Sequence, residues 1–151
     1  MRYLFIIGCL TGLLKLSGFA QSKINIEVNN LRSKQGMLYF SLFKSGDGFP
    51  SEYEKAFKRG KIEIDKSDVV KFSFDNIPAG TYAISLFHDE DNDGKVKMNK
   101  MKMPLEGTGA SNNARGKMGP PKYNDALFEV DKTEVNMKLK VSYYNPPPPK
   151  S

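Results

Sequence analysis

The residues best suited to chemistry lie in one acidic run, Asp89-Glu90-Asp91-Asn92-Asp93-Gly94. In a D-x-D-x-D-G pattern, alternate carboxylates converge when the backbone coils around a hard cation such as calcium, and the glycine permits the sharp turn. If Asp89 is position one of an EF-hand loop, position twelve is Lys100, where a bidentate Glu belongs. No amphipathic helix flanks the run either, so any calcium site here is expected to lie outside an EF-hand.

The ligands expected for such a site are oxygen atoms. They are the carboxylates of Asp89, Asp91 and Asp93, the carbonyl of Lys95, and a distant oxygen of Glu106 or Asn112. Its affinity is expected to be weak, about 0.1 to 1 mM, as in extracellular modules. The alternative is a solvated loop without an ion, in which nearby lysines balance the carboxylates: Lys95, Lys97, Lys100 and Lys102.

His88 precedes the acidic run and is the only histidine, which excludes a multi-histidine zinc site within one chain. We expect it to hold a strand end or a loop by hydrogen bonds. The alternative is a hydrolase in which His88 acts with Asp89 or Glu106 on a water molecule. Ser111 is the nearest candidate nucleophile, but its surroundings match neither G-x-S-x-G nor a phosphate-binding loop.

Three methionines follow the acidic run, Met98, Met101 and Met103. Thioethers at this M-x-x-M-x-M spacing can hold Cu(I) in an exported protein, so a copper-binding module is a further alternative. Loop methionines more often cover the edge of a sandwich as adaptable apolar side chains.

Alternating apolar residues predict seven short strands and no long helix, which indicates an all-β fold, a single antiparallel sandwich. The strands are expected at residues 24–28, 37–43, 62–64, 70–74, 82–87, 126–130 and 135–143. A hairpin turn at residues 131–133 is expected to join the last two.

Two stretches between the strands lack a sustained period. Residues 45–60 are expected to form a loop with one helical turn. Residues 89–124 are dense in Gly, Asn, Lys and Pro, and a connection of this length in a compact domain is usually functional or disordered. We expect a single long loop there. The prolines at residues 146–149 predict a short polyproline tail, residues 146–151.

The chain begins with Arg2, an apolar stretch and the small residues Gly18 and Ala20, the layout of a secretory signal peptide over residues 1–20. Residues 21–145 would then form the sandwich domain, exported to the periplasm or secreted. Cys9 is the only cysteine, and too few residues precede it for a lipoprotein acylation site. Cleavage after Ala20 would leave a domain without disulfides.

The formal net charge of the chain is +6. Its lysines often alternate with apolar residues, as at 135–141, which is typical of the solvent face of a strand. We therefore expect no nucleic-acid partner, and no second segment is apolar enough to be a transmembrane span. The expected partner is a protein or a small molecule.

Several segments resemble the bacterial exported family catalogued as domain of unknown function 2141. The resemblance extends over residues 24–143. Its segments include Ile77-Pro78-Ala79-Gly80-Thr81-Tyr82, His88-Asp89-Glu90, Glu106-Gly107 and Ser111-Asn112-Asn113. The resemblance implies a sandwich of the prealbumin or carboxypeptidase-regulatory-domain type and no activity. It also implies that the long loop is ordered over one end of the sandwich, and that its Asp and Asn side chains can organise it without an ion.

The chain departs from this family at Lys97, where relatives usually carry an acidic residue, and this departure argues against calcium here. The sequence leads to an exported, non-enzymatic binding or structural module whose acidic loop is a candidate for weak calcium binding. No other cofactor is expected.

Overall fold

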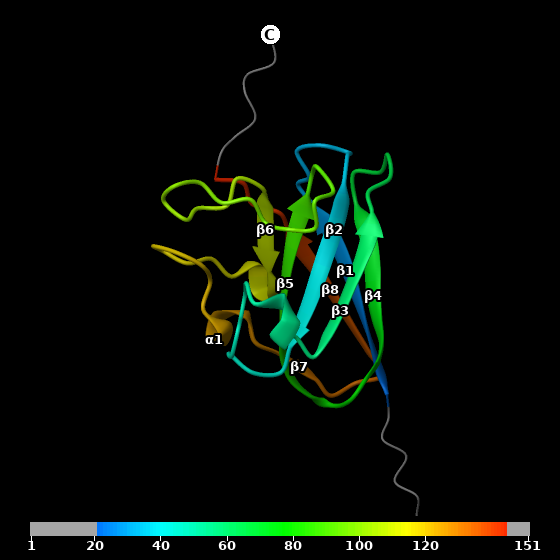
Figure 1. The fold of residues 1–151 in the computed structure, drawn as a ribbon. Coiled ribbons are helices and arrows are strands. Elements are labelled where there is room, and N and C mark those ends of the chain that lie inside the picture. Colours follow the sequence, from blue (N-terminus) through cyan, green and yellow to red (C-terminus); the bar gives the residue numbers. More distant parts are fainter. Residues whose placement is uncertain (1–20, 145–151) are drawn as a thin grey trace, which may run out of the picture.

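The computed structural model describes residues 21–144 (Figure 1). Alternating apolar residues account for most of its strands. The predicted signal peptide, with Cys9, and the predicted proline tail lie outside the described residues. All seven predicted strands are present, one with the predicted bounds and six with altered bounds, together with an eighth. They are β1 Ser22–Asn29, β2 Met37–Phe43, β3 Lys58–Glu63, β4 Val70–Ile77, β5 Gly80–Asp89, β6 Gly107–Ala110, β7 Phe128–Val130 and β8 Glu134–Lys140.

The strands form two sheets, a sandwich-like arrangement. One sheet has the order β4-β1-β8; the other has the order β3-β2-β5-β6, and β7 also pairs with β5. Inward residues of both sheets meet in one core cluster, which includes Ile26 of β1, Phe40 of β2 and Ile84 of β5. The all-β prediction is confirmed, but the sandwich is not purely antiparallel because β8 runs parallel to β1 in the register Lys23 to Glu134.

Two further sequence predictions are wrong. The predicted long loop over 89–124 is interrupted by β6, which pairs antiparallel with β5 and adds the eighth strand. The turn at 131–133 does not close a hairpin, since β7 pairs with β5 in one sheet and β8 pairs with β1 in the other. The turn therefore carries the chain from one sheet to the other.

The outward face of β5 is also covered, which explains why its residues from Tyr82 to Asp89 are all buried. The ring of Phe87 stacks between those of Tyr39 and Tyr53, with ring centroids 4.7 and 5.1 Å away. Tyr53 begins the short 3-10 helix η1, Tyr53–Lys55, which is the helical turn predicted within residues 45–60. Within the described part of the chain, no helix has the length and apolar character needed to cross a membrane.

Candidate functional site

The acidic loop, residues 90–106, begins where β5 ends and returns to the sheet as β6 (Figure 1). Its first anchor is backbone packing: Asp89 pairs with Met37 across β2 and β5. A Cβ atom added to the neighbouring Gly36 would lie 1.9 Å from the carbonyl oxygen of Asp89, and Gly36 has φ of +84°. Only glycine allows the chain to pass this close to the start of the loop.

His88 is fully buried at the end of β5. Its Nε2 lies 2.8 Å from the carbonyl oxygen of Gln35, which can only accept, so Nε2 carries the hydrogen. Its Nδ1 lies 2.8 Å from the Tyr143 hydroxyl, and that oxygen accepts the backbone N–H of Arg32 at 3.2 Å. The phenolic hydrogen is thus left to be donated to Nδ1. This geometry fits a histidine that links three separate segments.

Arg32 forms an ion pair with Glu90, two residues after this histidine. The Arg32 Nε lies 2.9 and 3.1 Å from the two Glu90 carboxylate oxygens, and the guanidinium also donates to the Leu105 carbonyl at 3.1 Å. It lies 4.5 Å from the centroid of the Tyr143 ring. Burial alone would raise the pKa of Glu90, but the hydrogen bond and charge of Arg32 outweigh it and hold that pKa below its usual range. The same hydrogen bond raises the pKa of Arg32.

Two buried carboxylates hold the loop backbone. Asp89, which is fully buried, accepts the N–H groups of Asp93 at 3.2 Å and Gly94 at 2.9 Å. Glu106 is 4% exposed and accepts those of Glu90 at 3.1 Å and Lys97 at 3.0 Å. Four backbone donors therefore compensate two buried acids and tie the first half of the loop to them.

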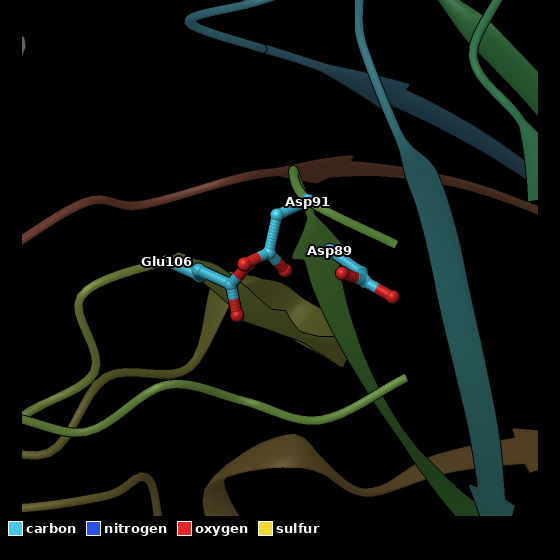
Figure 2. Close-up of side chains that lie close together, drawn as sticks. All are labelled: Asp89, Asp91 and Glu106. Carbon is cyan, nitrogen blue, oxygen red and sulfur yellow. The ribbon is translucent and has the colours of Figure 1, made fainter. Parts of the chain in front are cut away.

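The same two acids come together with a third. Carboxylate oxygens of Asp89, Asp91 and Glu106, hereafter the carboxylate trio, all lie within 4.8 Å of one another. Figure 2 shows the Asp91 and Glu106 carboxylates directed toward each other, with Asp89 beside them at the end of β5. Asp91 is exposed and pairs with the Lys97 ammonium. The trio supplies oxygen ligands of the kind that calcium takes, with one lysine competing for them.

Two of the remaining predicted ligands, Asp93 and Asn112, have other partners. Asp93 accepts the backbone N–H of Lys95 at 2.8 Å. Asn112 lies beyond the far end of β6 and donates to the Leu127 carbonyl at 2.7 Å, so the structure does not bring it to the trio. Of the two distant oxygens expected from the sequence, the structure brings Glu106 to the acidic run.

Ser111 and Asn113 form hydrogen bonds to the backbone of neighbouring segments. The buried Ser111 hydroxyl accepts the Ile84 N–H at 2.9 Å and donates to the Ala126 carbonyl. Ile84 is four residues before His88 on β5, about 13 Å along the strand, so Ser111 is bound at a different part of β5 from His88. Asn113 accepts the Lys140 N–H at 2.7 Å and thereby joins the β6 side of the molecule to the edge of β8.

The three methionines lie at the tip of the loop. Asn99 organises this tip, since its side-chain oxygen accepts the N–H groups of Met101 at 2.9 Å and Met103 at 3.0 Å. Met98 and Met101 are exposed, whereas Met103 is half-buried.

Sequence reasoning missed Arg32 and the role of Tyr143. Both residues are distant from the loop in the chain, and neither belongs to a recognisable motif. The only available indication was the family resemblance at Glu90, whose partner it does not name. Tyr143 was assigned only to a strand, whereas its hydroxyl lies between His88 and Arg32.

The fold and the site together define an all-β, two-sheet domain that presents an ordered acidic loop at one sheet end. The chain belongs to the family described as "Uncharacterized protein conserved in bacteria (DUF2141)", whose model matches residues 26–138. No curated protein and no solved structure matches the chain.

Proposed function

We propose that this protein is an exported, non-enzymatic binding or structural module whose acidic loop binds calcium weakly at the carboxylate trio. The observation that carries the proposal is the approach of Asp89, Asp91 and Glu106 to within 4.8 Å. Two of these carboxylates are buried and are oriented by backbone N–H groups, so the ligands are positioned before an ion arrives.

The same geometry limits the affinity. Calcium takes six to eight oxygen ligands, so three carboxylates leave several positions to water or carbonyl groups. Lys97 must also release Asp91 when the ion enters. Both effects favour a dissociation constant of about 0.1 to 1 mM. The buried, doubly hydrogen-bonded His88 supports a structural role for that residue in preference to the hydrolase alternative.

The finer description of the fold, a sandwich of the prealbumin or carboxypeptidase-regulatory-domain type, belongs to this proposal as well. The resemblance of the sequence segments supports it, together with the two packed sheets. Comparing the strand connections in an experimental structure with those of such sandwiches would test it.

Thermal unfolding in calcium and in chelator tests the calcium site. A ligand that binds only the native state at 0.1 to 1 mM stabilises it by about 1.4 to 2.7 kcal/mol at 10 mM, which corresponds to a rise in melting temperature of roughly 4 to 10 °C. Asp91→Asn should abolish the rise, because it removes one of the three carboxylate ligands, and the exposed position of Asp91 should leave the fold intact. The matched control is Asp131→Asn on the turn to β8. No rise in the native protein, or an equal rise in Asp91→Asn, would refute the site.

A further inference from the structure

Basic residues are concentrated in one part of the described chain. Residues 94–124, hereafter the basic segment, contain seven basic residues and one acidic residue, whereas the rest of residues 21–144 contains 13 basic and 16 acidic residues. The single acid is Glu106, which is buried and held by backbone donors. All seven cations are exposed: Lys95, Lys97, Lys100, Lys102, Arg115, Lys117 and Lys122.

Most of these cations have no carboxylate partner. Within residues 21–144, only Lys97 among the seven forms an ion pair, with Asp91. The exposed lysines of other segments are more often paired, as Lys55 is with Asp47 and Glu52. The basic segment therefore presents a positive surface that the molecule itself does not neutralise.

The same segment carries the most exposed large apolar side chains. Met118 is 100% exposed and Met101 is 73% exposed, the two highest values among such residues in the described chain. Met98 adds a third exposed thioether. Long unbranched side chains of this kind can enter an apolar phase without a preformed pocket.

The two groups of residues lie on one side of the molecule. The segment's two loops, residues 95–105 and 114–122, flank β6, which is the last strand in the order of its sheet. Since β6 has four residues, about 10 Å separates its ends. Figure 1 shows both loops protruding from the same side of the sandwich.

We propose that this face docks on an anionic phospholipid surface. Lysines attract the headgroups, and the methionine tips enter the boundary between headgroups and acyl chains. The segment is poorly suited to nucleic acid, because its one aromatic residue, Tyr123, packs against Gly46 and Phe49 and is not free to stack on bases. The side chains on which docking is tested, those of Lys100, Lys102, Met101 and Met118, lie outside the carboxylate trio, so the test does not depend on calcium binding.

Vesicle co-sedimentation of the purified protein, expressed from the full chain, tests this proposal. We expect binding to vesicles of phosphatidylglycerol and phosphatidylethanolamine but not to phosphatidylcholine vesicles. Binding should disappear in 0.5 M NaCl, where the screening length is about 4 Å. Lys100→Glu with Lys102→Glu should weaken it at least about 25-fold, since each basic residue near an anionic surface contributes about fivefold. Met101→Ser with Met118→Ser should weaken it about tenfold.

Matched controls carry the same changes elsewhere on the surface. Lys66→Glu with Lys132→Glu, and separately Val69→Ser, should leave sedimentation within about twofold, because these residues lie outside the basic segment. The proposal is overturned by absence of binding to every vesicle, by equal binding to phosphatidylcholine, or by equal loss in the controls. Binding that is insensitive to the lysine changes would point to another part of the chain and also overturn it. Equal binding to polyglutamate would assign the face to acidic polypeptides instead.

Discussion

Lys97 contacts two members of the carboxylate trio through different groups. Its backbone N–H donates to Glu106, while its ammonium pairs with Asp91. The two halves of the residue therefore have opposite consequences. The backbone N–H helps to orient the Glu106 carboxylate. The ammonium competes with a cation for the Asp91 carboxylate.

Lys97→Gln should separate these two effects. The substitution keeps the backbone donor and removes one positive charge next to the trio, which we expect to tighten calcium binding about fivefold, since a unit charge about 4 Å away contributes about 1 kcal/mol in water. Calorimetric titration with calcium measures the change. Lys95→Gln is the control because the Lys95 side chain is exposed and unpaired within the described residues. Equal tightening in Lys95→Gln would show that the effect comes from net charge and not from the pair with Asp91.

Tyr143 makes a second residue-scale prediction, on stability. Tyr143→Phe leaves the Nδ1 of His88 and the N–H of Arg32 without their hydroxyl partner, which should cost about 1 to 3 kcal/mol in the free energy of unfolding. Urea unfolding measures this cost. Tyr144→Phe is the control, since Tyr144 is 51% exposed; a cost as large as that of Tyr143→Phe would contradict the proposed linkage.

The pH dependence of the same residue has a definite sign. Burial raises the pKa of Tyr143 to about 12 in the folded protein, against about 10 when unfolded. The folded state thus retains the proton over that interval, and the contribution of Tyr143 is fully present below pH about 10 and is lost as pH rises toward 12. Between pH 10 and 12, the free energy of unfolding of the native protein should fall more steeply than that of Tyr143→Phe, as measured by urea unfolding. Parallel profiles of unfolding free energy against pH would contradict the raised pKa of Tyr143.

At the scale of elements, the acidic loop depends on the close passage of β2 past the end of β5. Gly36→Ala should destabilise the protein by more than about 3 kcal/mol, because its Cβ would overlap the Asp89 carbonyl and the residue has φ of +84°. Gly94→Ala is a matched control: its φ is +76°, but the nearest atom to its Cβ would be 3.9 Å away. Thermal unfolding compares the two, and equal losses would show that backbone conformation alone matters there.

The apolar pattern was enough to predict most elements and too little to predict their pairing. Alternation at Ile24, Ile26 and Val28 identified β1, but nothing in a period of two distinguishes a parallel neighbour from an antiparallel one. β6 was missed because Gly107-Thr108-Gly109-Ala110 has no large apolar residue. It is a strand because small residues fit against its neighbours: a Cβ on Gly107 would lie 2.3 Å from Val141.

The candidate site was predictable only where its members are close in sequence. The acidic run identified Asp89 and Asp91, and Glu106 was one of two distant possibilities. Asn112, the other, is separated from Glu106 by β6 and donates to Leu127. Arg32 could not be inferred, since its contact with Glu90 follows from the packing of distant segments and from no local pattern.

At the scale of the molecule, two packed sheets support a loop that is held by buried side chains at the end of β5. The contacts have distinct roles: Tyr143 binds His88 at the end of β5, the buried carboxylates hold the loop backbone, and Asp91 is exposed. Calcium binding should therefore leave the sheets unchanged and act locally on the first half of the loop.

Calcium titration followed by amide chemical shifts tests this account most directly. The largest shifts should occur at the N–H groups that the trio holds, those of Glu90, Asp93, Gly94 and Lys97. They should saturate together at millimolar calcium, while β1 and β8 remain unshifted. No shifts up to 10 mM calcium, about ten times the weakest affinity expected, or shifts spread over exposed acids such as Glu27 and Asp75, would contradict it.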